Sequence, residues 1–218
     1  MATVVLLKIP EINIAPFMND GSTKDEKEAV VTHIKNACEE IVFFIITGHG
    51  IPVETVEEVC SIAQQFFDWP LEKKNLLEGS GCGYLPMEKE NLAATRNVNA
   101  PPDLKESFNI SSRKEQNKWP DLLNFESICM NYFDKMVKLA SVIMQIFALA
   151  LELPINYFNE YITPPNVVLR FLNYPKITHQ PLPQQLRAAE HTDYGTITIV
   201  RSDSPGLQVQ DRNKNWID

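Results

Sequence analysis

The sequence predicts an α+β fold, in which a helical first part is followed by an antiparallel β region. Up to Pro154, apolar side chains recur mostly at steps of three and four, which is the period of an amphipathic helix. Beyond Pro165 the period changes to two, the period of a strand. With 218 residues, 44% of them hydrophobic and 22% charged, the chain can bury a sizeable core and has neither a disordered nor a fibrous composition.

The first expected elements are a short strand and an amphipathic helix. Residues 4–10 are largely apolar and end at Pro10, which predicts a strand that stops there. Ser22 and Asp25 have the spacing of a capping pair at a helix N-terminus. The apolar face of the following helix consists of Val30, Ile34, Ala37 and Ile41.

The middle of the chain alternates between regular elements and loops. Residues 42–47 form an apolar run that predicts a buried strand, closed by His49 between two glycines. A second amphipathic helix is expected to end before Pro70. Its buried side consists of Val56, Val59, Ala63 and Phe67. Residues 79–119 are polar and irregular, which predicts loops with one short strand near 107–110.

The later part of the chain begins with the longest predicted helix. Between Pro120 and Pro154 apolar residues step by three and four throughout, which predicts a packed core helix. Residues 166–174 predict a well-buried strand, and residues 196–200, which are β-branched at every position, predict another. The C-terminal end predicts a hairpin, with strands at 207–210 and 216–217 and a loop at 211–215.

Composition argues against several classes of function. The formal charge of −8 disfavours a nucleic acid or an anionic membrane surface as the main partner. No glycine-rich phosphate-binding motif and no Cys-x-x-Cys pair occurs in the sequence. Lys8 and Pro10 interrupt the first apolar stretch, so we expect no signal peptide, and no apolar run reaches the length of a membrane span. These features favour a cytoplasmic protein that acts on a small-molecule substrate.

The candidate site is His191-Thr192-Asp193, just before the β-branched run. In an extended chain residues i and i+2 point to the same side, about 7 Å apart, so His191 and Asp193 can both reach one ion. An imidazole and a carboxylate on one face suit the two-His-one-carboxylate site of non-haem Fe(II) oxygenases. Because the pattern is short, a surface turn with a capping Asp remains the alternative.

Longer stretches of the chain resemble the isopenicillin N synthase-like family of Fe(II)/2-oxoglutarate oxygenases. The resemblance covers nearly the whole chain, and its six matches occur in the family's order. They are Ile9-Pro10, Val42-Phe43-Phe44 with Gly48-His49-Gly50-Ile51, Phe66-Phe67 with Pro70, Glu72 and Lys73, Asp103–Phe108, Leu169-Arg170 with Asn173-Tyr174-Pro175, and His191–Val200 with Pro205–Val209. Gly48 and Asn13 depart from the family, which usually has Asn and Asp there.

The resemblance implies Fe(II) as the metal, 2-oxoglutarate as cosubstrate with ascorbate as an aid, and hydroxylation or desaturation of a small molecule. His191 and Asp193 match the metal ligands, and Tyr174 matches the phenol offered to 2-oxoglutarate. A strand-end Tyr facing solvent is the alternative for Tyr174. Arg170 lies four residues before Tyr174 on the same strand face, so we expect it to face the substrate; a peripheral salt bridge is the alternative.

Two family features do not occur in the sequence, namely a second iron-binding His after His191 and a later Arg-x-Ser pair for 2-oxoglutarate. The resemblance therefore implies a C-terminally truncated form with impaired catalysis. Residues 1–120 would be the family's N-terminal region, and residues 121–218 the long helix plus the first half of a double-stranded β-helix, or jelly roll. Half of such a core leaves strand edges unpaired and a sheet face uncovered.

Other interpretations stay open at this point. The chain could be a non-catalytic fragment that acts through its surface, or an unrelated helical-plus-β binding protein in which His-x-Asp is accidental. Three further histidines are candidates for a replacement ligand. We expect His49 to stabilise its turn, His33 to lie on the polar face of its helix, and His179 to lie in a proline-rich loop.

Overall fold

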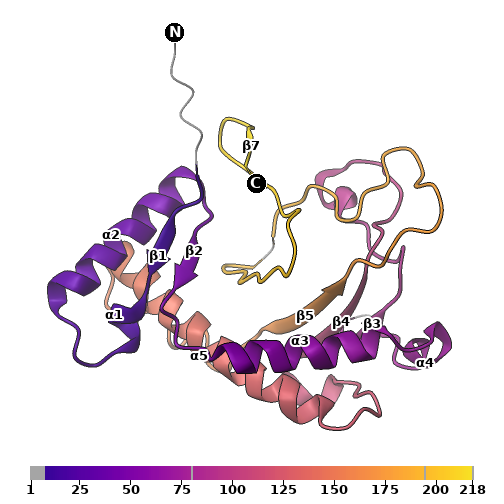
Figure 1. The fold of residues 1–218 in the computed structure, drawn as a ribbon. Helices are drawn as coiled ribbons and strands as arrows, with labels where there is room; N and C mark the ends of the chain where they lie inside the picture. Colours follow the sequence, from indigo (N-terminus) through magenta and orange to yellow (C-terminus); the bar gives the residue numbers. More distant parts are fainter. Residues whose placement is uncertain (1–7, 80, 194, 218) are drawn as a thin grey trace. The chain divides into compact units, whose positions relative to one another are not determined.

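The computed structural model describes residues 8–79, 81–193 and 195–217 (Figure 1). The elements are β1 (Glu11–Asn13), α1 (Ala15–Met18), α2 (Lys24–Glu40), β2 (Ile45–Thr47), α3 (Val53–Phe67), α4 (Leu71–Asn75), β3 (Gly83–Leu85), η1 (Leu92–Arg96), β4 (Glu106–Ser111), η2 (Lys114–Gln116), α5 (Phe125–Ala150), β5 (Val168–Asn173), β6 (Val209–Gln210) and β7 (Trp216–Ile217). The mixed α+β class is confirmed. No helix in these described segments is long and apolar enough to span a membrane.

The chain divides into two compact units that interleave along the sequence. The first unit is formed by Met1–Ile51, Lys138–Thr163 and Ile199–Asp218, and the second by Pro52–Val137 and Pro164–Thr198. Among the described residues the strands form three small sheets, ordered β1-β2, β3-β4-β5 and β6-β7, and none closes into a jelly roll. The division expected at residue 120 separates two regions of the sequence and is not the division into these compact units. It stays a prediction.

In the first unit a parallel strand pair lies beside α2 (Figure 1). Pro10 is not the end of a strand, because β1 begins after it and the Pro10 carbonyl accepts from Ile45 N at 2.8 Å. Residues 4–7 of the predicted strand lie outside the described residues. The capping pair is one position later than predicted: Thr23 and Glu26 form a capping box. The apolar face of α2 is confirmed by Val30, Ile34, Ala37 and Ile41, all buried.

The run 42–47 differs from its prediction as a buried strand. Only Ile45–Thr47 is a strand, and Val42, Phe43 and Ile45 are 59%, 45% and 51% exposed. Val42 has a φ of 73°, in the left-handed region where a β-branched residue is a true outlier. It stands just after α2, where glycine is the usual residue, and its N–H donates to Ala37 O at 2.9 Å. α2 ends at this point of the fold, and the chain after it takes the left-handed backbone although a valine disfavours that conformation.

The second unit is built around the antiparallel sheet β3-β4-β5 and the helix α3, which runs along it (Figure 1). The short strand predicted near 107–110 is β4, and it is longer and buried along its whole length. Phe66 of α3 packs on Phe108 of β4 with ring centroids 4.7 Å apart, and Phe125 of α5 lies 5.4 Å from Phe108. These edge-to-face contacts make the aromatic centre of the unit.

A buried carboxylate joins four elements of this unit. Glu106 in β4 is 4% exposed, and its Oε2 is 2.8 Å from Lys74 Nζ of α4. Tyr84 of β3 donates its hydroxyl to the same oxygen, and Asn173 of β5 donates to Oε1 at 2.8 Å. Burial is the main cause that raises the pKa of Tyr84, and the hydrogen bond to Glu106 is the second. Both keep the phenol protonated. The buried charge of Glu106 is therefore compensated by one cation and two further hydrogen-bond donors.

The strands predicted after Pro165 are only partly confirmed. β5 alternates between exposed and half-buried positions, so it is not the well-buried strand that was predicted. Residues 196–200 are not a strand, because β propensity needs a neighbour to pair with and the run has none among the described residues. The C-terminal hairpin is confirmed, with Val209 opposite Ile217 and Gln210 opposite Trp216.

Val42→Gly is expected to raise the free energy of unfolding by about 0.5–1 kcal/mol. Relief of the left-handed strain exceeds the extra backbone entropy of glycine, and little buried surface is lost. Val53, 65% exposed at the start of α3, provides the control, because Val53→Gly should lower stability. Urea denaturation of each variant measures the change, and a Val42→Gly protein no more stable than wild type would contradict the strain.

Lys74→Met is expected to lower the free energy of unfolding by about 3–5 kcal/mol, because it leaves the buried Glu106 carboxylate without its cation. Lys73→Met on the same helix is the matched control. Lys73 is exposed and lies 3.4 Å from the Trp69 ring centroid, so its loss should cost no more than about 1 kcal/mol. Equal destabilisation by the two variants would contradict this account.

Candidate functional site

One face of the β4–β5 pair carries polar side chains. The strands are antiparallel, with Asn109 opposite Arg170 and Ser107 opposite Leu172. Opposed residues of such a pair point to the same side, and alternate residues share a face. Tyr174 follows β5 directly. Arg170 and Tyr174 therefore belong to the face of the sheet opposite to Phe108 and Glu106, and they share one face as the sequence predicted.

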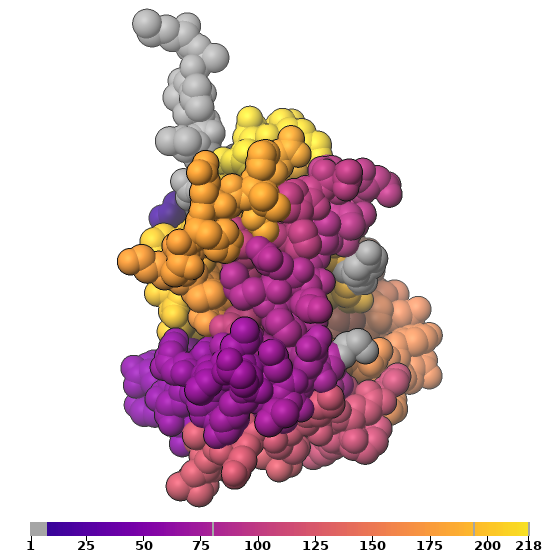
Figure 2. Space-filling model, turned by 90° about the vertical axis from the view of Figure 1, so that its right-hand side faces the viewer, coloured from indigo at the N-terminus to yellow at the C-terminus, as the bar shows by residue number. Residues whose placement is uncertain are grey.

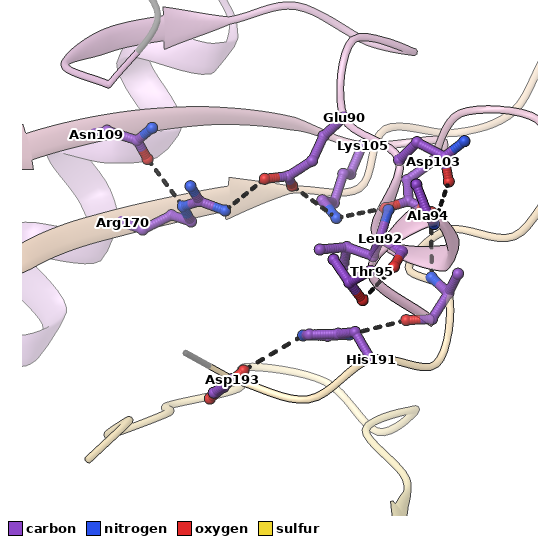
Figure 3. Close-up of polar contacts among 12 residues, drawn as sticks. Glu90, Leu92, Ala94, Thr95, Asp103, Lys105, Asn109, Arg170, His191 and Asp193 are labelled. Atoms are coloured by element: carbon purple, nitrogen blue, oxygen red, sulfur yellow. Dashed lines mark hydrogen bonds and ion pairs between the residues drawn. The ribbon is translucent and has the colours of Figure 1, made fainter. Parts of the chain in front are cut away.

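Arg170 is held by two side chains (Figure 3). Its Nε donates to Asn109 Oδ1 at 3.0 Å, and its Nη1 donates to Glu90 Oε1 at 2.8 Å. The side chain is 40% exposed. Arg170 thus makes an ion pair, which was the alternative to a substrate-facing role. Its other guanidinium N–H groups make no hydrogen bond with the described part of the chain, and the substrate-facing role stays a prediction.

The positive and negative charges beside Arg170 balance each other. Lys105 is 3% exposed, and its Nζ lies 2.8 Å from Asp103 Oδ2 and 2.9 Å from Glu90 Oε2. Burial alone would raise the pKa of Glu90, but Lys105 and Arg170 outweigh burial and hold that pKa below its ordinary value. Two cations and two carboxylates therefore occupy one small region without a net charge.

Tyr174 lies within the field of this charged cluster. Its side chain is 42% exposed. Burial raises the pKa of the phenol above its ordinary value, while the charges of Lys105 and Asp103 act in opposite directions. The hydroxyl is therefore protonated at neutral pH and can act as a hydrogen-bond donor.

His191 and Asp193 face each other at the end of a loop (Figure 3). His191 Nε2 is 3.5 Å from Asp193 Oδ1, and the two side chains are 35% and 48% exposed. His191 Nδ1 lies 2.9 Å from the Ala189 carbonyl oxygen. Both neighbours only accept, and the Ala189 carbonyl is the closer one, so the geometry favours the tautomer with the proton on Nδ1, in which the lone pair of a neutral imidazole is on Nε2.

This pair suits a divalent metal ion but supplies only two ligands. Among the described residues no group of three or more His, Cys, Asp or Glu could hold a metal ion. Of the three remaining histidines, His49 Nδ1 accepts from Ile51 N at 3.1 Å, His179 Nε2 is 3.9 Å from Glu88 Oε1, and His33 is exposed on α2. An unprotonated imidazole nitrogen beside a carboxylate is a suitable donor set for Fe(II), and a site with two protein donors holds it weakly.

The loop that carries His191 packs against the segment around Asp103. Figure 2 shows the orange surface of this loop lying against the magenta surface of residues near 90–104. Leu104 N donates to Leu186 O at 2.9 Å, and Ala189 N donates to Asp103 Oδ1 at 3.2 Å. A chain of polar contacts thus runs from Arg170 through Glu90, Lys105 and Asp103 to the His191 loop (Figure 3).

Sequence reasoning assigned no role to the polar residues that complete the site. Asp103 and Lys105 were noted in the Asp-x-Lys-Glu segment without a function. Alternation along β4, continued one residue back to Lys105, would have placed Lys105 and Asn109 on one face. Glu90 carries no local signal, because it pairs with Arg170 across 80 positions of the chain.

Comparison with known proteins identifies the class. Residues 9–125, more than half of the chain, match the family described as non-haem dioxygenase in morphine synthesis N-terminal. The 2-oxoglutarate-dependent dioxygenase citB of Monascus ruber is 31% identical, over 96% of this chain and 70% of its own length. The 2-oxoglutarate-dependent dioxygenase tropC of Talaromyces stipitatus is 28% identical, over 92% of this chain and 69% of its own length.

Solved structures agree with the sequence relatives. A full-length Neurospora crassa protein, crystallised in complex with alpha-KG, has a TM-score of 0.83 at 30% identity, covering 99% of this chain and 70% of that one. A Caulobacter crescentus protein assigned to the 2OG-Fe(II) oxygenase family has a TM-score of 0.78 at 21% identity, which supports the fold alone. The chain belongs to the Fe(II)- and 2-oxoglutarate-dependent dioxygenase family, and it spans about 70% of the length of these relatives.

Glu90→Gln is expected to lower the free energy of unfolding at pH 7 by about 1–3 kcal/mol, because Lys105 and Arg170 both lose a charged partner. The pKa of Glu90 lies below its ordinary value of 4.5, so its contribution is present above pH 4.5 and is lost as the pH falls through the folded pKa. The difference between wild type and variant should therefore shrink in acid.

Urea denaturation at neutral and acidic pH measures this difference. Glu28→Gln is the control, because Glu28 is 62% exposed in its pair with Lys24 and should change stability by no more than about 0.5 kcal/mol. A Glu90→Gln effect that is the same at both pH values would contradict the lowered pKa.

Proposed function

We propose that the chain takes part in the Fe(II)- and 2-oxoglutarate-dependent oxidation, by hydroxylation or desaturation, of a small-molecule substrate. His191 and Asp193 would hold the metal, Tyr174 would contact 2-oxoglutarate, and Arg170 would face the substrate. The observation that carries the proposal is the approach of His191 Nε2 to within 3.5 Å of Asp193 Oδ1 while Nδ1 is engaged by Ala189 O. This arrangement directs a nitrogen lone pair and a carboxylate to one place.

When bound, Fe(II) and 2-oxoglutarate would supply oxygen activation coupled to the release of succinate and CO2. The chain's own residues would bind and orient. Tyr174, protonated at neutral pH, would donate a hydrogen bond to a carboxylate of 2-oxoglutarate. Arg170, whose charge is balanced by Glu90, would offer its remaining N–H groups to acceptor atoms of the substrate.

The relatives support a small molecule as the substrate. Structures of the Neurospora crassa protein are described with alpha-KG and thymine, and with alpha-KG and 5-formyluracil. For this chain we propose the substrate class only, with ascorbate as an aid and without a nucleic acid or a membrane as partner. The formal charge of −8 supports this assignment.

We extend the proposal to the arrangement of the chain. Residues 1–120 would form the family's N-terminal region, and residues 121–218 would contribute the long helix and the first strands of a double-stranded β-helix. The likeness of 99% of the chain to the Neurospora crassa structure, at a TM-score of 0.83, supports this division of roles. The unclosed sheets of the described residues agree with a partial core.

These 218 residues by themselves should be impaired in catalysis. They offer a two-ligand metal site in their described part and no Arg-x-Ser pair after His191. The second candidate function is therefore a non-catalytic one, carried out through surface contacts. The two candidates differ in metal binding, because only the first requires it.

Anaerobic titration calorimetry with Mn(II), a redox-stable substitute for Fe(II), is the test. We expect weak binding by residues 1–218 and a loss of at least about tenfold in His191→Ala. His33→Ala is the control, because His33 lies on α2 in the first unit and should leave binding unchanged. No binding by wild type would favour the non-catalytic function, and robust 2-oxoglutarate-dependent succinate release with Fe(II) and ascorbate would contradict the impairment.

A further inference from the structure

We propose that Asp103 is the positioning residue that fixes the tautomer and orientation of His191. Its catalytic meaning rests on the proposed function, but its effect on the imidazole is a property of the folded chain alone. Asp103 touches neither a substrate nor a metal ligand directly. It acts through one residue, Ala189.

The connection consists of two hydrogen bonds in series. Asp103 Oδ1 accepts from Ala189 N at 3.2 Å, and the Ala189 carbonyl oxygen lies 2.9 Å from His191 Nδ1. Asp103 is 1% exposed and Ala189 is 9% exposed, so water does not compete freely for these groups. The N–H lies on the peptide before Ala189 and the carbonyl on the peptide after it, so Asp103 acts by anchoring this buried residue, and with it the backbone that presents the carbonyl to His191.

Asp103 is itself held from several sides. Its Oδ2 accepts from Lys105 Nζ at 2.8 Å and from Leu92 N at 3.2 Å, and its own N–H donates to Glu90 O at 2.8 Å. A buried carboxylate is tolerated when it is paired with a cation and hydrogen-bonded, and Asp103 meets both conditions. Its position is consequently set by Lys105, just before β4, by η1 and by the Glu90 backbone, and not by the loop that it orients.

This positioning matters because a neutral imidazole can carry its proton on either nitrogen. Both neighbours of the ring only accept, but the Ala189 carbonyl lies at 2.9 Å from Nδ1 and the Asp193 carboxylate at 3.5 Å from Nε2, so the closer carbonyl favours the form with the proton on Nδ1. Partners that orient a metal-binding histidine in this way are typically worth about 10- to 100-fold in metal affinity. Asp103 is therefore expected to act on metal binding through the imidazole.

A competing anchor is Glu190, which lies between Ala189 and His191 in the chain. Arg96, at the end of η1, forms an ion pair with Glu190, and the two side chains are 36% and 40% exposed. Ion pairs this exposed contribute about 0–1 kcal/mol. If this pair held the loop, Arg96→Ala would disturb His191 more than a change at Asp103 would, so Arg96→Ala belongs in the test.

Asp103→Asn keeps the shape of the side chain but has one acceptor oxygen for three donors, namely Ala189 N, Leu92 N and Lys105 Nζ. The amide oxygen should remain with the Lys105 cation, and its NH2 group then opposes Ala189 N. Asp211→Asn is the matched control, because Asp211 is 5% exposed and also accepts from two backbone N–H groups, at 2.8 Å each. It belongs to the first unit and has no part in the site.

The first readout is the tautomer of His191, from ¹⁵N NMR of the metal-free protein at about pH 8.5, well above the ordinary imidazole pKa. We expect the Nδ1–H form in wild type, in Asp211→Asn and in Arg96→Ala, and a mixture of both forms in Asp103→Asn. The second readout is Mn(II) affinity by calorimetry, which should fall about 10- to 100-fold in Asp103→Asn alone.

An unchanged tautomer in folded Asp103→Asn, or a larger disturbance in Arg96→Ala, would overturn the inference. If Asp103→Asn does not fold, Ala189→Pro removes the N–H that Asp103 accepts, keeps the carbonyl, and should give the same mixture. A wild-type protein that shows the expected tautomers but binds no Mn(II) would contradict the proposed function and leave the positioning of His191 intact.

Discussion

The buried charge of Glu106 is the constraint on which the sheet of the second unit depends. Its carboxylate accepts from Lys74 of α4, from Tyr84 of β3 and from Asn173 of β5, so four elements meet at one side chain. In a medium of low polarity these bonds are strong, and a missing partner is costly. The position of Asn173 also decides that of the next residue, Tyr174, which turns to the opposite face of the sheet.

Because neighbouring residues of β4 point in opposite directions, one short strand carries two separate polar networks. Glu106 is bonded on the side of the aromatic cluster, whereas Lys105 and Asn109 act on the other side. The second network keeps Arg170 in an ion pair and connects it, through Asp103, with the His191 loop. The position of the His191 loop is thus tied to Asp103 and Lys105, which lie just before β4, and His191 itself lies in irregular backbone.

The sequence predicted what depends on local pattern and little of what depends on distant partners. The long helix α5 and the hairpin β6-β7 follow from periodicity and turn residues, and the i, i+2 spacing of His191 and Asp193 agrees with the approach of their side chains. The left-handed backbone of Val42 could not be foreseen, because it results from how a helix ends in space. The pairing of Arg170 with Glu90 joins residues far apart in sequence and has no local signature.

Residues 196–200, Thr-Ile-Thr-Ile-Val, carry no charge and no proline, and the structure places them outside any sheet. Such a segment with exposed positions is the kind from which cross-β fibrils grow, since identical copies can stack and satisfy each other's backbone groups. A high protein concentration is therefore expected to favour fibril formation through this segment. Substitution of one residue of this run by lysine is expected to oppose fibril formation, and the run lies outside the Glu106 network.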